Sequence, residues 1–217
     1  MRVELPSGTP AEVVAGSGER GIVICPDIGG MRPLFDDLAV QLASDNGWTV
    51  CVVEPFPDHP DSSVEDRVGG LAGQITDERL LGDMVAAADL TEAPVVAAMG
   101  FCMGGMYALK AAGTGRFDRA AAFYGMIHTP EAWRGEGQDE PLDALRRRGA
   151  TEVMAIIGER DAWTPPEHVA ELEEAGVVVV RYPEAEHGFV HDASRPAHRS
   201  ADAADAWRRV TAFLGDG

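Results

Sequence analysis

The chain has 217 residues, of which 45% are hydrophobic and 25% charged, a composition typical of one globular domain. Its 18 basic and 36 acidic residues give a formal net charge of −18, which argues against nucleic acid or an anionic membrane surface as a partner. The sequence shows neither an apolar signal-peptide core after Met1 nor an apolar run of transmembrane length, so we expect a cytoplasmic protein.

Apolar runs alternate with helical patterns along the chain. Buried strands are predicted at residues 21–25, 48–53, 95–99, 120–124, 152–157 and 177–180, and helices at residues 34–45, 76–90, 106–112, 166–175 and 196–214. Polar loops are predicted at residues 56–70 and from residue 125 to about residue 140. Continuous apolar strands between helices indicate a mostly parallel sheet covered by helices on both faces. We therefore predict one α/β domain over residues 1–217.

The stretch Gly-Phe-Cys-Met-Gly-Gly at 100–105 lies between a predicted strand and a predicted helix. Strand, Gly-x-nucleophile-x-Gly and helix in this order form the nucleophile elbow of the α/β-hydrolases, with Cys102 here in place of serine. Glycines are needed where the new helix packs closely against neighbouring strands. A thiol at a helix N-terminus is favoured as the thiolate. The alternative is a glycine-rich turn with an inert buried cysteine.

A nucleophilic cysteine needs a base and a group that orients the base. In α/β-hydrolases the chain order is nucleophile, acid and histidine. Asp161 follows the strand predicted at 152–157, and His187 follows the strand predicted at 177–180, so both arrive in this order at strand ends. Each alone has a simpler explanation, a helix cap for Asp161 and an exposed turn for His187. Together with Cys102 they predict a catalytic triad.

The three cysteines, Cys25, Cys51 and Cys102, are odd in number and lie in or beside apolar runs. This is not the pattern of a disulfide framework, and the cysteines lack the paired spacing of zinc ligands. We expect neither a metal nor an organic cofactor.

Four segments together resemble the dienelactone hydrolase family, a small capless branch of the α/β-hydrolases. They are Gly-Phe-Cys-Met-Gly-Gly at 100–105, Asp-Arg-Ala-Ala-Ala-Phe-Tyr-Gly at 118–125, Gly-Glu-Arg-Asp at 158–161 and Glu-Ala-Glu-His-Gly-Phe at 184–189. The resemblance extends over nearly the whole chain. It implies an α/β-hydrolase fold without a separate cap domain and a triad of Cys102, His187 and Asp161.

The resemblance also implies a carboxylate near the thiol, at the start of the oxyanion loop. The family usually has Glu-Ile there, whereas this chain has Asp27-Ile28. Asp27 is one methylene shorter, and it is expected either to activate the thiol or to order the loop. The backbone N–H groups of Ile28 and Met103 are expected to form the oxyanion hole.

Substrate selection is expected to depend on residues around the triad. Dienelactone hydrolases bind a substrate carboxylate with arginines, one of them four residues after the catalytic histidine, where this chain has His191. Arg32, Arg79 or Arg160 could replace that arginine. The resemblance assigns Tyr124 to the pocket, and Trp163 and Phe189 are expected to add apolar walls.

We therefore expect a hydrolase that cleaves an activated ester or enol lactone through a Cys102 thioester. A broad-range carboxylesterase or thioesterase is the first alternative, and a non-hydrolytic ligand-binding or thiol redox protein is the second. The expected partner is a small-molecule ester or lactone. We expect the protein to be a monomer or a small homo-oligomer.

Overall fold

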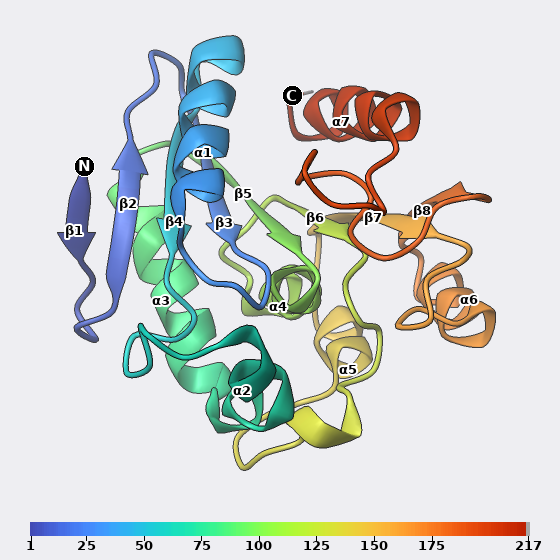
Figure 1. The fold of residues 1–217 in the computed structure, drawn as a ribbon. Helices are drawn as coiled ribbons and strands as arrows, with labels where there is room; N and C mark the ends of the chain where they lie inside the picture. Colours follow the sequence, from blue (N-terminus) through green and yellow to red (C-terminus); the bar gives the residue numbers. More distant parts are fainter. Residues whose placement is uncertain (216–217) are drawn as a thin grey trace.

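The computed structural model describes residues 1–215; the last two residues of the predicted domain 1–217 lie outside the described residues. Eight strands form one sheet in the order β1-β2-β4-β3-β5-β6-β7-β8 (Figure 1). The strands β3 to β8 are mutually parallel, and β1 and β2 pair antiparallel at one edge. Their bounds are β1 Arg2–Glu4, β2 Pro10–Val14, β3 Arg20–Cys25, β4 Thr49–Val53, β5 Val95–Phe101, β6 Arg119–Phe123, β7 Glu152–Gly158 and β8 Val178–Tyr182.

Helices cover both faces of this sheet. One core cluster places α1 and α7 on one face, and a second cluster places α3, α4, α5 and α6 on the other (Figure 1). The helices are α1 Pro33–Asn46, α2 Val64–Gly69, α3 Asp77–Leu90, α4 Met103–Ala111, α5 Pro141–Arg146, α6 Pro166–Glu174 and α7 Ser200–Gly215. Within residues 1–215, the architecture is that of an α/β-hydrolase without a separate cap domain, as predicted.

The six strands predicted from apolar runs are all present, whereas β1 and β2 were not predicted. These two edge strands are largely exposed or half-buried, and therefore lack the continuous apolar pattern of the central strands. Two short helices, α2 and α5, lie in or just after the predicted polar loops. A capping box between Ser63 and Asp66 starts α2.

Two predicted helix starts are displaced. The helix α4 begins at Met103 rather than at residue 106, directly after the elbow, and α7 begins at Ser200 rather than at residue 196. None of the helices among residues 1–215 combines the length and the apolar character needed to cross a bilayer.

The order of the strands determines where the candidate site lies. In the sheet, β3 lies between β4 and β5. The connection after β3 leads to β4 on one side, and the connection after β5 leads to β6 on the other side, so the direction of the chain reverses between β3 and β5. Ligands of parallel sheets bind outside the carboxyl ends of the strands at such a reversal. Asp27 and Ile28 follow β3, and Cys102 follows β5.

Candidate active site

Cys102 occupies a strained turn between β5 and α4. Its φ is +55° and its ψ is −117°, a conformation that non-glycine residues rarely adopt. The backbone N–H of Cys102 donates to the carbonyl of Phe123 on the neighbouring strand at 3.0 Å, which helps to hold this turn. The side chain is partly exposed, whereas Cys25 and Cys51 are buried. This is the backbone conformation expected of the predicted nucleophile elbow.

Two glycines of the elbow are required by close backbone contacts. A Cβ atom on Gly104 would lie 2.0 Å from the carbonyl oxygen of Cys25 and 2.2 Å from that of Pro26. A Cβ atom on Gly100 would lie 1.9 Å from the carbonyl oxygen of Gly104. The first turn of α4 therefore packs directly against the end of β3, and this contact brings the Asp27-Ile28 loop next to the elbow.

Two backbone N–H groups are available at this junction. Met103 is the first residue of α4, and the first N–H groups of a helix have no partner within the helix. Among the turn, loop and cap hydrogen bonds of residues 1–215, neither the Ile28 N–H nor the Met103 N–H donates to a backbone carbonyl. Both are the residues that the sequence analysis expected to form the oxyanion hole.

Asp161 and His187 form a hydrogen-bonded pair. The loops after β7 and β8 bring His187 Nδ1 within 2.7 Å of Asp161 Oδ2, and the other oxygen of Asp161 accepts the Trp163 backbone N–H at 2.8 Å. His187 Nε2 is buried and has no hydrogen-bond partner among the described residues. Burial lowers the pKa of His187, but interactions with Asp161 and the Cys102 thiol outweigh burial and raise it to about 9. The structure thus brings the three predicted triad residues together.

Asp27 is the centre of a buried hydrogen-bond network. Its Oδ1 accepts Arg32 Nη1 at 2.6 Å and the Gly29 backbone N–H at 2.8 Å. Its Oδ2 accepts Arg32 Nη2 and His191 Nε2, both at 2.8 Å. Burial raises the pKa of Asp27, but the hydrogen bonds from His191 and Arg32 outweigh burial and hold it well below its usual range. Both oxygens are therefore occupied by hydrogen-bond donors, and the carboxylate is a poor proton acceptor.

His191 also belongs to this network. Its side chain is only 1% exposed, and Nδ1 forms a hydrogen bond with the Tyr124 hydroxyl. In the neutral ring, Nε2–H donates to Asp27 and Nδ1 accepts from Tyr124. Burial, followed by the nearby Cys102, raises the pKa of Tyr124 well above its usual value. The structure places His191 beneath the surface, with both nitrogens engaged, rather than free to bind a substrate anion.

The remaining pocket predictions fall in two different environments. Phe189 is fully buried and its ring packs against Tyr124 and Tyr182, which is the environment of a core residue. Trp163 is 43% exposed, and its ring centroid lies 6.4 Å from that of His187. The ring of Trp133, which the sequence analysis did not single out, stacks on Trp163 at 5.8 Å. Trp133 ends the short 3-10 helix Glu131–Trp133, and no local pattern predicts that it meets Trp163, which follows a different strand.

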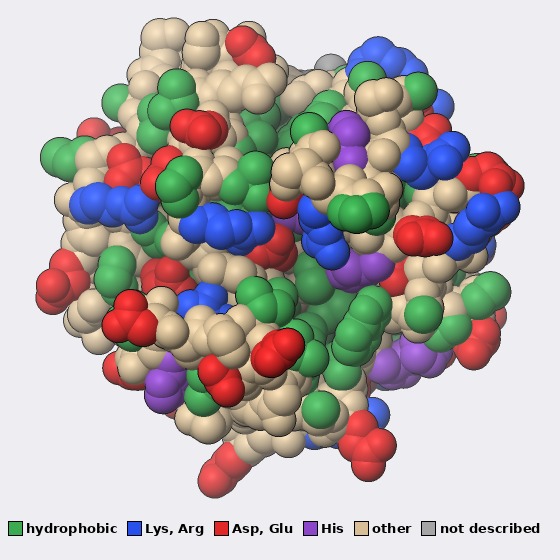
Figure 2. All heavy atoms as spheres, in the orientation of Figure 1, with side chains coloured by type: hydrophobic (Ala, Val, Ile, Leu, Met, Phe, Trp, Pro, Cys, Tyr) green, Lys and Arg blue, Asp and Glu red, His purple; other side chains and the backbone are tan. Residues whose placement is uncertain are grey.

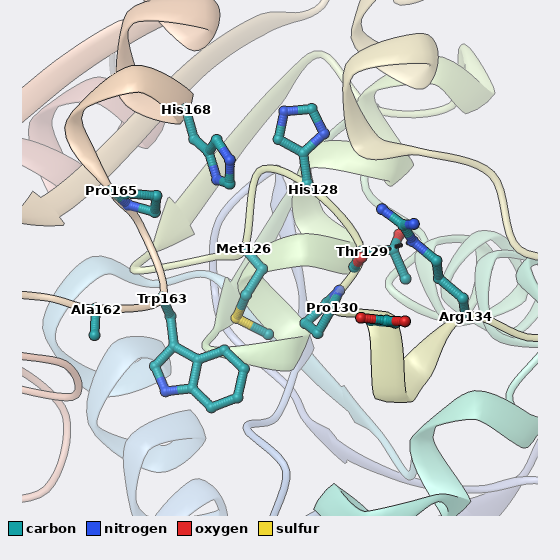
Figure 3. A pocket seen from close by; sticks show the side chains of 10 residues that line it. Met126, His128, Thr129, Pro130, Arg134, Ala162, Trp163, Pro165 and His168 are labelled. Carbon is teal, nitrogen blue, oxygen red and sulfur yellow. Dashed lines mark hydrogen bonds between the residues drawn. The ribbon is translucent and has the colours of Figure 1, made fainter.

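A cavity of about 460 Å³ lies beside Trp163. Met126, Ala162 and Trp163 form part of its wall, and Figure 3 shows the Trp163 and Met126 side chains close together there. Cys102 and His187 do not line it, so it adjoins the triad through Trp163. The face in Figure 2 is hollowed near its centre, where hydrophobic and histidine side chains lie among charged ones.

The arginines proposed as anion partners are already paired. Arg32 binds Asp27 through both terminal nitrogens. Arg79 lies 3.1 Å from Asp83 and donates to a backbone carbonyl, and Arg160 pairs with Glu184. Each of these three guanidinium groups already has a carboxylate partner.

Comparison with known proteins agrees with this architecture. The family model of the dienelactone hydrolase family matches residues 8–216. A carboxymethylenebutenolidase of Rhodococcus opacus is 28% identical over 212 residues, covering 92% of this chain and 81% of that protein. A probable 2-oxo-3-(5-oxofuran-2-ylidene)propanoate lactonase of a Bradyrhizobium species is 26% identical over 206 residues, covering 89% of this chain and 82% of that protein.

A solved structure shares the fold. A protein of Klebsiella pneumoniae, assigned there to the dienelactone hydrolases, superposes with a TM-score of 0.85 at 22% identity, covering 100% of this chain and 98% of that chain. The family match, the curated relatives and the fold agree, and the chain belongs to the dienelactone hydrolase family and is a carboxylic-ester hydrolase of the lactone or ester type.

Proposed function

We propose that this hydrolase works through a Cys102 thioester, with His187 as the base and Asp161 as its orienting acid. The observation that carries the proposal is the strained elbow at Cys102, φ +55°, with the Asp161–His187 pair held at 2.7 Å at the ends of neighbouring strands. Activation of a cysteine by an adjacent histidine, itself oriented by a carboxylate, is the general arrangement of such nucleophiles.

In the first half of the reaction, His187 takes the proton of the Cys102 thiol and becomes the imidazolium, and the resulting thiolate attacks the ester or lactone carbonyl. The developing oxyanion accepts hydrogen bonds from the N–H groups of Ile28 and Met103, each such donor contributing about 3–4 kcal/mol in comparable enzymes. The tetrahedral intermediate then expels the alkoxide, which takes a proton from the His187 imidazolium. In a lactone this step opens the ring and leaves the product attached as a thioester.

In the second half, His187 takes a proton from water as the water attacks the thioester carbonyl. The second tetrahedral intermediate expels the Cys102 thiolate and releases the carboxylic acid. Asp161 stabilises the imidazolium in both halves. In the first tetrahedral intermediate, the thiolate leaves more readily than an ordinary alkoxide. The reaction therefore goes forward best when the alkoxide is itself a good leaving group, as in activated esters and enol lactones.

We further propose that the acyl side of the substrate is uncharged where the family places a carboxylate. The support is the engagement of His191 with Asp27 and Tyr124, together with the carboxylate partners of Arg32 and Arg160. A substrate anion at any of these groups would have to exchange with, or share, the partner that the group already has. An uncharged ester needs no such exchange.

The mechanism is tested with Cys102→Ala and an activated aryl ester. We expect kcat to fall by about 10⁴-fold or more, as in comparable triads. Wild type should also accumulate an acyl-enzyme that intact-mass spectrometry detects. Cys51→Ala, a buried cysteine on β4, is the matched control and should keep its acyl-enzyme. Turnover by Cys102→Ala near the wild-type rate would refute the assignment.

The substrate is tested with an enol lactone that carries a carboxylate and with its methyl ester. We expect a higher kcat/KM for the methyl ester. Preference for the free acid would contradict the uncharged acyl side but leave the Cys102 mechanism intact. Equal turnover of aryl esters, acyl thioesters and enol lactones would instead support a broad-range carboxylesterase or thioesterase.

A further inference from the structure

A second cluster of chemically active side chains lies at the cavity beside Trp163. His128 follows β6, and His168 and Glu171 belong to α6. The potential ligand atoms of these three residues all lie within 4.8 Å of one another. His128 Nε2 is 3.0 Å from Glu171 Oε1, and the two imidazole rings meet edge to face with centroids 4.4 Å apart. Figure 3 shows His128 and His168 near each other among the side chains that line the cavity.

The fold explains how these groups meet. His168 and Glu171 are three residues apart on α6, so they lie on the same face of that helix. His128 is 43 positions from Glu171, and only the packing of α6 beside the loop after β6 brings it there. The spacing of the cysteines, on which the expectation of no metal rests, does not bear on this cluster. No local pattern links His128 to the two residues of α6.

The donor set suits a particular class of cation. Two imidazole nitrogens and one carboxylate oxygen are typical ligands of Zn²⁺ and related divalent transition metals, whereas Mg²⁺ and Ca²⁺ prefer oxygen ligands alone. The three side chains are only partly buried, so small rotations can bring the ligand atoms to the roughly 2.0–2.2 Å bonds that zinc requires. A fourth coordination position would remain for water or a small ligand.

A second carboxylate supports His128 as a ligand. Glu140 Oε2 is 3.8 Å from His128 Nδ1 and is itself held by the Thr129 backbone N–H at 2.8 Å. When a cation replaces the proton that Nε2 shares with Glu171, a negative charge on this side favours a proton on Nδ1 and frees the Nε2 lone pair for the cation. Metal-binding histidines are commonly oriented by a carboxylate in this way.

Only two of the three side chains in the cluster are hydrogen-bonded to each other. His128 Nε2 and Glu171 can share one proton, and the ring nitrogens of His168 form no hydrogen bond with any residue in the described part of the chain. A divalent cation would engage all three groups at once.

We propose that His128, His168 and Glu171 bind one divalent transition-metal ion of the Zn²⁺ class at this cavity. The ion would connect α6 to the loop after β6. Binding to the folded protein alone should therefore raise the melting temperature. This proposal is independent of the ester chemistry, because its readout is metal binding.

The experiment measures Zn²⁺ binding by titration calorimetry on tag-free, chelator-treated protein. Cys102→Ser is the background, because a thiol near His187 could itself bind zinc. We expect one ion per chain and a higher melting temperature with zinc. Co²⁺ should give the visible absorption of a site with nitrogen and oxygen ligands rather than a thiolate charge-transfer band.

In that background, His168→Ala and Glu171→Gln should each weaken Zn²⁺ binding by more than about tenfold, since even residues behind a ligand contribute that much. His59→Ala, which removes an exposed histidine outside the cluster, is the matched control and should bind as the background does. Circular dichroism checks that each variant is folded. The proposal is overturned if no zinc binds, or if both cluster variants bind with the affinity of the control.

Discussion

Replacement of Asp161 by Asn should remove a pH-dependent part of the stability of this protein. Asp161 Oδ2 lies 2.7 Å from His187 Nδ1 and is the first of the interactions that raise the pKa of His187. Burial acts in the opposite direction, so without the carboxylate the pKa should fall below 9, toward or below the ordinary value of 6.5. The substitution Asp161→Asn keeps the size of the side chain, removes its charge and replaces one of its two accepting oxygens with an NH2 donor.

The magnitude follows from the difference between the folded and unfolded pKa of His187. A rise from 6.5 to about 9 corresponds to roughly 3 kcal/mol of stability, shared between Asp161 and Cys102. The folded pKa is the higher one, so this contribution is complete below pH 6.5 and disappears as the pH rises through 9. The stability advantage of wild type over Asp161→Asn should therefore shrink by about 1–3 kcal/mol across this window.

Urea unfolding at a series of pH values measures this difference directly. Other titrating groups are common to both proteins and largely cancel, and Asp61→Asn, at an exposed site, controls for the loss of a surface charge. Titration of the His187 ring by NMR should give the same change in pKa. A stability difference that stays constant from about pH 6 to about pH 9.5 would refute the linkage between Asp161 and His187.

Three other substitutions test packing and charge. Gly104→Ala should lower the free energy of unfolding, measured with urea, by about 3 kcal/mol or more, because the new Cβ meets a backbone oxygen of Cys25 at 2.0 Å. A variant as stable as wild type would refute this contact. Asp77→Ala should lower the free energy of unfolding by about 3–5 kcal/mol, because it leaves the fully buried Lys110 ammonium without its partner at 2.8 Å. A decrease of less than about 1 kcal/mol would contradict this. Asp27→Ala should lower the melting temperature and kcat but leave the alkylation rate of the elbow thiol unchanged. A slower alkylation would show that the carboxylate activates the thiol.

Much of the fold could be predicted from the sequence, because central parallel strands are buried on both faces and therefore appear as continuous apolar runs. The edge strands β1 and β2 could not, since they lie at the edge of the sheet and remain partly exposed. The helix α4 begins earlier than predicted because its first turn contains Gly104 and Gly105, which are needed for close packing although glycine is a poor helix former.

Some residues of the candidate site could likewise be predicted from the sequence, and others could not. Cys102, Asp161 and His187 could be located individually because each follows a strand, and strand ends can be recognised from the local pattern. The roles expected of His191 and Phe189 could not be judged in this way. Whether a side chain at a strand end points to solvent or into the core depends on its neighbours from other elements. Here these neighbours are Asp27 and Tyr124.

The sequence by itself therefore determined the nucleophile motif, the order of its partners and the parallel sheet, all of which depend on patterns within a few residues. Only the tertiary structure decided that Asp27 and His191, two departures from the family pattern 164 positions apart, are hydrogen-bonded to each other. It also decided that His128 meets Glu171 across 43 positions. The physical reason is that these contacts depend on distance and burial in the folded chain, and neither quantity leaves a mark on the local sequence.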